Sequence, residues 1–216
     1  MSYNLRQRLT AEFAGTVFLL MIVVGSGIMA AKLSGGNVGL ALLANALATV
    51  AGLVVLITAL GPVSGSHFNP VVTALMASRG ELRWNEAGGY ITAQIAGGIA
   101  GVVLSHVMFD LPVLQISTTV RSSFGQFISE IIATFGLLST ILLVRKHRPE
   151  VVAAAVALFV GAAYWFTAST SFANPAVTIA RMLSDSFAGI RPIDAPAFVA
   201  AQVIGASIAA LVFRRV

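Results

Sequence analysis

Long apolar runs separated by short polar segments dominate this chain of 216 residues. A helix needs about 20 apolar residues to cross a hydrocarbon core roughly 30 Å thick, at a rise of 1.5 Å per residue. The pattern therefore predicts an all-α membrane protein in which six helices span the bilayer. The six runs cover residues 13–31, 39–60, 87–107, 124–144, 151–166 and 196–213.

Two shorter apolar segments follow the second and the fifth run, and each begins with Asn-Pro. Asparagine is a favoured helix N-cap and proline suits the first helical position, so Asn69-Pro70 and Asn174-Pro175 predict two helix starts. Helices over 69–79 and 174–184 would each be about 15 Å long, which is half a membrane. We expect two re-entrant half-helices that begin at the midplane, an arrangement typical of a permeation or binding site.

The two halves of the chain resemble each other weakly. Each half has a glutamate at the start of its first span (Glu12, Glu130) and a glutamine within its third span (Gln94, Gln202). Three spans per half is an odd number, so the halves would insert in opposite orientations. The sequence predicts a single transmembrane domain, 1–216, built from inverted repeats over about 1–109 and 124–216.

Composition supports the membrane interpretation. Hydrophobic residues make up 57% of the chain and charged residues only 10%, whereas soluble domains are about 25% charged. The net charge is +5, but the basic residues lie in short clusters between apolar runs and form no continuous face for nucleic acid. Nine of the thirteen fall on the side of the two termini, which predicts cytoplasmic termini. The nine are Arg6, Arg8, Arg79, Arg83, Arg145, Lys146, Arg148, Arg214 and Arg215; the other four are Lys32, Arg121, Arg181 and Arg191.

Acidic and amide side chains inside the spans are candidates for function. Glu12 and Glu130 could couple transport to protons or cations, since an intramembrane carboxylate is often functional. We favour a structural role, in which each accepts hydrogen bonds from backbone N–H groups of a re-entrant loop. Gln94 and Gln202 are predicted to hydrogen-bond between helices rather than bind solute.

Other polar and aromatic residues are interpreted conservatively. His67, two residues before Asn69, is expected near the vestibule on the terminal side, where it either braces the loop or titrates as a pH gate. Trp84, Tyr164 and Trp165 are interpreted as anchors at the membrane interface. The sequence has no catalytic triad, paired carboxylates, phosphate-binding loop or metal-ligand cluster, so we expect no enzyme, cofactor or metal.

These features give the chain a resemblance, over essentially its whole length, to the aquaporin and aquaglyceroporin (major intrinsic protein) family. It most resembles bacterial aquaglyceroporins associated with arsenic resistance. Valine at position 71 departs from the alanine usual in the first box. The resemblance implies a homotetramer in a bacterial inner membrane, with a path for small solutes and water through each protomer. The residues that carry it are the string 64–71, Asn69, Pro70, Val71, Asn174, Pro175, Ala176, Glu12, Glu130, Gln94 and Gln202.

Counting from the two asparagines, the resemblance also implies an outer selectivity filter of Thr49, Ala162, Ser171 and Val177. Most of the family has arginine at the last of these positions and histidine or glycine at the second. The four side chains are small and nearly neutral, so the predicted filter is wide and free of arginine. We therefore expect a passive channel for glycerol-like polyols, trivalent metalloid acids such as arsenite, methylated arsenicals and water.

Two other functions remain open: a strictly water-selective aquaporin, and a proton-coupled secondary transporter that uses Glu12 or Glu130. A purely structural membrane protein is disfavoured by four small residues at the counted filter positions. Arg181 lies one helical turn beyond Val177. It could supply a positive vestibule in place of the missing filter arginine, but we favour a guanidinium that reaches out to the lipid headgroups.

Overall fold

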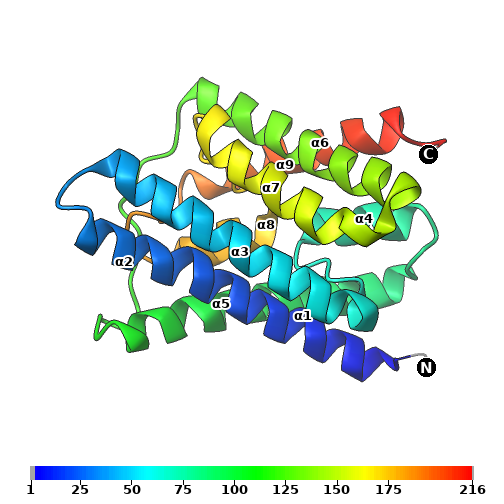
Figure 1. The fold of residues 1–216 in the computed structure, drawn as a ribbon, viewed down its shortest axis with the longest axis horizontal. Coiled ribbons are helices and arrows are strands. Elements are labelled where there is room, and N and C mark those ends of the chain that lie inside the picture. Colours follow the sequence, from blue (N-terminus) through cyan, green and yellow to red (C-terminus); the bar gives the residue numbers. More distant parts are fainter. Residues whose placement is uncertain (1–2, 216) are drawn as a thin grey trace.

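The computed structural model describes residues 3–215 as a bundle of helices, and this part of the chain contains no strand. Six helical stretches are long and apolar enough to cross a membrane, which confirms the predicted fold class. They lie side by side along the long axis, and both termini are at one end (Figure 1). The elements are α1 Leu5–Leu20, η1 Met21–Gly25, α2 Ser26–Leu33, α3 Val38–Ser64, α4 Pro70–Ser78, α5 Trp84–Met108, α6 Phe124–His147, η2 Pro149–Val151, α7 Val152–Phe166, α8 Pro175–Arg181 and α9 Ala195–Val212.

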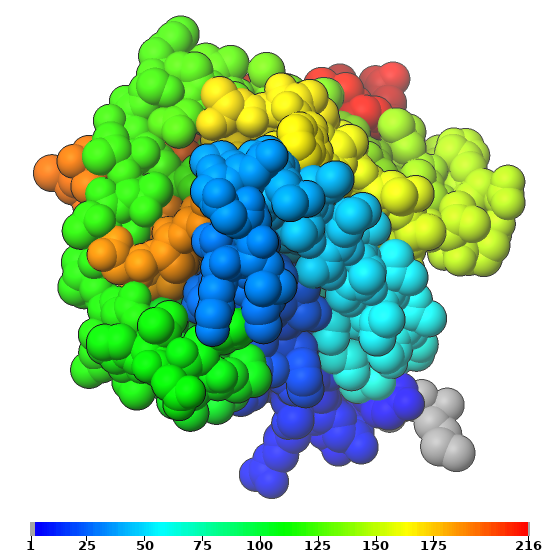
Figure 2. Space-filling model, turned by 60° about the vertical axis from the view of Figure 1, so that its left-hand side comes forward, coloured from blue at the N-terminus to red at the C-terminus, as the bar shows by residue number. Residues whose placement is uncertain are grey.

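The two ends of the bundle differ in their connections. We call the end that holds both termini the terminal end; it also holds the turn 79–83 between α4 and α5. The opposite end, here the loop end, holds the α2–α3 turn, the long loop 109–123 and the segment 182–194. On that face the loop 109–123 and the segment 182–194 lie next to each other (green and orange, Figure 2), and the Ser117 N–H donates to the Met182 carbonyl at 2.9 Å.

The short helices α4 and α8 start inside the bundle, each from an Asn-Pro pair. The Asn69 side chain accepts from the Val71 N–H at 3.1 Å, and the Asn174 side chain accepts from the Ala176 N–H at 2.9 Å. Both asparagines therefore cap their own helices, as the sequence predicts. The predicted end of the second half-helix at residue 184 is wrong, because α8 ends at Arg181. There the Arg181 guanidinium turns back and donates to the Ala188 carbonyl.

The first span contains one turn of π-helix, η1, between α1 and α2. In a π-turn the backbone hydrogen bonds join residues five apart instead of four, so carbonyl groups near the turn lose their usual α-helical partner. Asn45 of α3 is buried and donates to the Val23 carbonyl at 2.9 Å and to the Ser26 hydroxyl at 2.8 Å. The polar side chain of one span thus satisfies the backbone of another.

Glycines allow the helices of each half to touch through their backbones. A Cβ at Gly97 of α5 would lie 2.5 Å from the Phe13 carbonyl oxygen of α1. In the second half, Gly205 of α9 packs in the same way on the Ile131 carbonyl of α6. Such small residues permit close approach of helices in membranes, where packing replaces the hydrophobic effect as the force between them.

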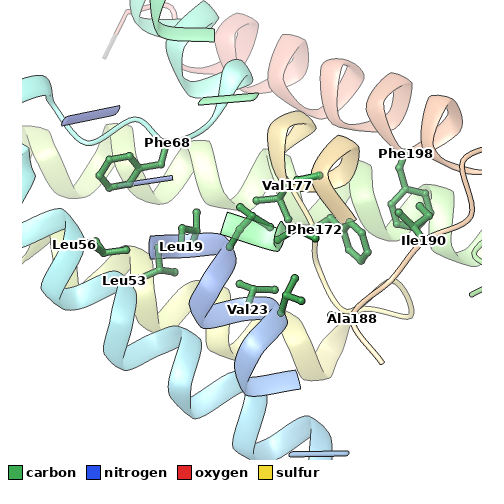
Figure 3. Packing of buried hydrophobic residues seen from close by; sticks show 14 of the residues in the cluster. Leu19, Val23, Leu53, Leu56, Phe68, Phe172, Val177, Ala188, Ile190 and Phe198 are labelled. Carbon is green, nitrogen blue, oxygen red and sulfur yellow. The ribbon is translucent and has the colours of Figure 1, made fainter. Parts of the chain in front are cut away.

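The largest apolar cluster lies between the spans and the two re-entrant loops. Leu19 and Val23 of the first span and Leu53 of α3 point toward Phe172 and Val177 at the second half-helix (Figure 3). The cluster joins residues from both halves of the chain, so it fixes the second re-entrant segment against the spans of the first half.

Replacement of Gly97 by alanine should destabilise the bundle. The added methyl group meets backbone rather than a movable side chain, and overpacking of this kind costs about 1–3 kcal/mol. We expect a lower unfolding midpoint in detergent. A Cβ at Gly88 of the same helix would meet no neighbouring atom within 4 Å, so Gly88→Ala is the control and should be neutral or stabilising. Equal midpoints for the two variants would contradict the backbone contact.

Candidate functional site

A cavity of about 240 Å³ lies between the spans and passes both re-entrant loops. Its walls are mostly apolar, with polar atoms from the two loops and at both ends. The terminal end is marked by His67 and Arg145, and the loop end by Thr49, Tyr164 and Arg181. The remaining lining residues are Leu19, Val23, Leu53, Ile57, Gly65, Ser66, Phe68, Asn69, Val72, Met76, Leu137, Ile141, Val152, Val156, Val160, Ser171, Phe172, Ala173, Asn174 and Val177.

The two asparagines line the middle of the cavity and tie the re-entrant loops to each other. Asn69 Nδ2 donates to the Ala173 carbonyl at 2.8 Å, and Asn174 Nδ2 donates to the Phe68 carbonyl at 2.8 Å. An amide NH₂ group has two N–H donors, so each asparagine keeps a second N–H beyond this tie. These second donors are available to a polar molecule in the cavity.

The other residues of the two Asn-Pro boxes lie behind the asparagines. Pro70, Val71, Pro175 and Ala176 are all buried at the starts of α4 and α8, and the set that lines the cavity does not include them. Valine at position 71 is accommodated within this packing, with its backbone N–H bonded to Asn69. These four residues therefore shape the half-helix starts without touching the contents of the cavity.

Glu12 is fully buried and accepts hydrogen bonds from the first re-entrant loop. Its Oε1 accepts from the His67 backbone N–H at 2.9 Å, and its Oε2 accepts from the Phe68 backbone N–H at 2.7 Å. Gln94 Nε2 donates both to Oε2 at 2.8 Å and to the Thr73 hydroxyl at 2.9 Å. One carboxylate thus links a span, a loop and a half-helix.

Glu130 repeats this arrangement in the second half. Its two oxygens accept from the backbone N–H groups of Phe172 at 2.9 Å and Ala173 at 2.8 Å. Gln202 Nε2 donates to the carboxylate at 2.7 Å and to the Thr178 hydroxyl at 2.9 Å. With both oxygens engaged by donors, this geometry favours a bracing role over proton coupling.

The re-entrant loops need this bracing because their backbone is strained. Ser66 and Phe68 have φ of 49° and 47°, and Ser171 and Ala173 have φ of 51° and 46°. For residues with a side chain, this left-handed conformation costs of order 1–3 kcal/mol. In this conformation two consecutive N–H groups of each loop reach the buried carboxylate, while the Phe68 and Ala173 carbonyls accept from the asparagines in the cavity.

The structure brings three of the four predicted filter residues to the cavity, because Thr49, Ser171 and Val177 are buried and line it. It does not bring Ala162, which is exposed on the outer face of α7. Tyr164, two residues later, lines the cavity instead, with its hydroxyl 3.3 Å from Thr49 Oγ1. Two residues correspond to about 200° around a helix. Counting residues from Asn174 does not show which face of α7 a position occupies, and here the count gives a residue on the outer face.

Two further interpretations need correction on this basis. Tyr164 is 4% exposed and cannot be an interface anchor, although Trp165 and Trp84 are exposed. Arg181 does not reach the lipid headgroups: it is 3% exposed, lines the cavity, and holds its guanidinium carbon 3.4 Å from the centroid of the Phe172 ring. Because α8 lies inside the bundle, the Arg181 side chain at its end stays inside the bundle and does not reach the lipid.

The terminal end of the cavity is lined by an imidazole and by a guanidinium group that is paired with a carboxylate. His67 Nδ1 lies 3.1 Å from Thr73 Oγ1, and Arg145 makes two hydrogen bonds of 2.7 Å to Glu81 in the α4–α5 turn. Within residues 3–215, no aspartate or glutamate lines the cavity and no group of three potential metal ligands is found. A cation inside the cavity would therefore find no carboxylate in its wall, and at the loop end it would meet the guanidinium group of Arg181.

Acid should release the Glu81–Arg145 pair. Hydrogen bonds and charge from Arg145 and Arg79 hold the pKa of Glu81 below its ordinary value of 4.5. Its contribution to stability is present above pH 4.5 and is lost as pH falls through the lower, folded-state pKa. We expect the protection of residues 79–83 from hydrogen exchange, measured against the intrinsic rate at each pH, to fall only below about pH 4.5. Glu81→Gln should show the low protection already at neutral pH, and unchanged protection in that variant would contradict the assignment.

Glu130→Gln should destabilise the second re-entrant loop. Glutamine has one acceptor oxygen for two backbone N–H groups, and hydrogen bonds to a charged acceptor are worth about 1.5–3 kcal/mol each. We expect a lower unfolding midpoint and reduced solute flux with no new dependence on the proton gradient. Glu150→Gln, at an exposed site, is the control. A variant of normal stability whose flux has lost a proton dependence would instead indicate coupling.

The comparisons with known proteins agree with this architecture. The chain belongs to the major intrinsic protein family, which it matches over residues 1–164 and 145–216. It is 52% identical over 213 residues to aquaglyceroporin AqpS of Rhizobium meliloti (strain 1021), covering 98% of this chain and 91% of that protein. It is 30% identical over 148 residues to a probable glycerol uptake facilitator of Thermotoga maritima, covering 61% of this chain and 62% of that protein.

A solved structure shows the same fold. The crystal structure of the aquaglyceroporin from Plasmodium falciparum superposes with a TM-score of 0.72 at 20% sequence identity, over 99% of this chain and 97% of that one. The similarity in fold extends over both halves of the chain, including the two re-entrant segments.

Proposed function

We propose that the protein is a passive channel that lets small uncharged hydroxylated solutes and water cross a membrane. Glycerol-like polyols, trivalent metalloid acids such as arsenite, and methylated arsenicals are the expected solutes. Family membership supports a channel, since the aquaglyceroporins of this family are channels and not enzymes. The named relatives AqpS and the glycerol uptake facilitator support the solute class.

One observation supports the solute class most directly: the composition of the cavity wall near its loop end. Val177 lines the cavity at the position where most of the family has arginine, and Thr49, Tyr164 and Ser171 supply hydroxyl groups around it. Apolar wall and hydroxyl groups on the same ring suit a solute with a carbon or metalloid core and several hydroxyls. Farther in, the free N–H groups of Asn69 and Asn174 offer two more donors.

The two alternatives fit the geometry less well. A strictly water-selective pore needs a narrow polar constriction, whereas the filter position that is arginine in most of the family is Val177 here, and Arg181 lines the cavity one helical turn beyond it. A proton-coupled transporter needs a carboxylate that exchanges protons with the pathway, whereas Glu12 and Glu130 do not line the cavity and accept hydrogen bonds on both oxygens. Flux that follows an imposed proton gradient would favour the transporter.

The setting in the cell is part of the proposal. The distribution of basic residues supports cytoplasmic termini, so the loop end would face the outside. A bacterial inner membrane and a homotetramer follow from the family resemblance. The apolar outer faces of the spans are compatible with lipid and with neighbouring protomers alike.

Val177→Arg should narrow the loop end of the cavity and slow glycerol more than water. We expect roughly tenfold slower glycerol uptake in stopped-flow measurements on proteoliposomes, which corresponds to about 1.4 kcal/mol in barrier height, and a smaller change for water. Thr49→Phe should act in the same direction from the opposite wall. Arsenous acid uptake, measured alongside, tests the metalloid part of the proposal.

Ala162→Phe is the matched control for these variants. Ala162 faces outward from α7, so a bulky side chain there should leave glycerol, arsenous acid and water fluxes unchanged. Reduced flux in Ala162→Phe would return this residue to the filter and contradict the placement of Tyr164. Unchanged glycerol flux in folded Val177→Arg would show that the constriction lies elsewhere.

A further inference from the structure

Two buried arginines at the loop end have no carboxylate partner within residues 3–215. Neither Arg121 nor Arg181 forms a salt bridge there, although they are only 8% and 3% exposed. Both guanidinium groups lie against one aromatic ring, with their central carbons 4.9 Å and 3.4 Å from the centroid of Phe172. Buried charges in proteins are normally paired, so two neighbouring cations without a counter-ion need an explanation.

The two arginines use their donors differently. Arg121 is held by the protein: its Nε donates to the Gly189 carbonyl at 2.7 Å and its Nη1 to the Ser169 carbonyl at 3.1 Å. Arg181 bonds to the protein through Nε alone, to the Ala188 carbonyl. Its two terminal amino groups make no bond to residues 3–215, and its side chain lines the cavity. A fork of N–H donors therefore faces the cavity.

A second, independent feature is found at Ser171, the residue before Phe172. The Ser171 hydroxyl is buried and has no hydrogen-bond partner in the part of the chain that the structure describes, and Ser171 also lines the cavity. An unpaired buried hydroxyl is costly unless something in the cavity bonds to it. Ser171 directly precedes Phe172, whose ring lies against the Arg181 guanidinium, so Phe172 connects the serine to the arginine, and both of them line the cavity.

We propose that Arg181 and Ser171 form a binding subsite for a small oxyanion at the loop end of the channel, with Arg121 supplying a second positive charge behind it. A planar guanidinium fork binds two oxygens of an oxyanion at once, and the serine hydroxyl donates to a third. The wall below this point is apolar, with Val177 and Leu53, so a charged occupant would have to shed its water to move inward. An oxyanion therefore stays at the subsite and obstructs the path for neutral solutes.

The test is inhibition of glycerol uptake by inorganic phosphate in phosphatidylcholine proteoliposomes, with chloride at equal ionic strength as the reference. Bidentate charge-assisted binding supports affinity on the order of millimolar, so about 10 mM phosphate should slow uptake at least twofold in the wild type. Each variant is compared with its own phosphate-free rate, because Arg181 and Ser171 line the channel.

We expect Arg181→Gln and Ser171→Ala to need at least threefold more phosphate for the same inhibition. Arg181→Lys, which keeps the charge but not the fork, should fall between wild type and Arg181→Gln. Lys32→Gln removes one exposed charge from the same end of the bundle and should match the wild type. If Ser171→Ala is the only variant that yields folded protein, the phosphate inhibition of glycerol uptake in that variant decides whether the subsite exists.

Phosphate that inhibits no more than chloride, or that inhibits Arg181→Gln as strongly as wild type, overturns the subsite. This inference rests on the proposed channel function, but the two fail differently. A wild type that does not conduct glycerol refutes the channel; calorimetric titration of phosphate into the detergent-solubilised protein would then still measure the subsite, with Arg181→Gln as the non-binding reference. Phosphate that binds in detergent but does not inhibit in liposomes would indicate a lipid headgroup as the occupant and overturn the obstruction by free oxyanion.

Discussion

Two stretches of non-helical backbone, 65–69 and 167–174, lie inside the bundle, where lipid offers their N–H groups no hydrogen-bond partner. Glu12 and Glu130 meet this requirement with buried carboxylates that each accept from two consecutive loop residues. The loops can then hold left-handed conformations that would otherwise be too costly, and the half-helices can begin at mid-depth. The cavity, its asparagines and its hydroxyl groups all depend on these two carboxylates.

The electrostatics of the cavity follow from the same arrangement. The acids are turned away from the cavity and saturated by donors, while His67, Arg145 and Arg181 are turned toward it. The interior is thus positive at its loop end, where Arg181 forms no salt bridge within residues 3–215, whereas Arg145 at the terminal end is paired with Glu81. Hydrogen-bond donors lie at the middle, and the wall between is apolar. Neutral molecules with several hydroxyl groups find hydrogen-bond partners along this path. A cation would also need a counter-ion, and the wall supplies none.

Six spans, two half-helix starts and the glutamates of both repeats could be predicted from the sequence, because each depends on local chemistry: apolar run length, the Asn-Pro cap, or an acid in an apolar segment. The face that each helix turns toward the cavity, and the depth of each side chain in the bundle, could not be predicted in this way. Ala162 and Tyr164 are two residues apart on one helix, and only packing decides which of them turns inward. The inward position of Arg181 could not be predicted either, because a sequence does not show that the chain folds back over the end of α8, where the Ala188 carbonyl holds the guanidinium inside.

The reciprocal asparagine ties have a consequence for the order in which the molecule is made. Asn69 donates to a carbonyl 104 residues later in the chain, and Asn174 to one 106 residues earlier. During synthesis the first half therefore enters the membrane with its half-helix start lacking its final partner. Contacts between distant residues close slowly because the intervening chain must first be ordered. The meeting of the two loops therefore comes only after the second half has entered the membrane, and neither repeat has a finished midplane until the other has arrived.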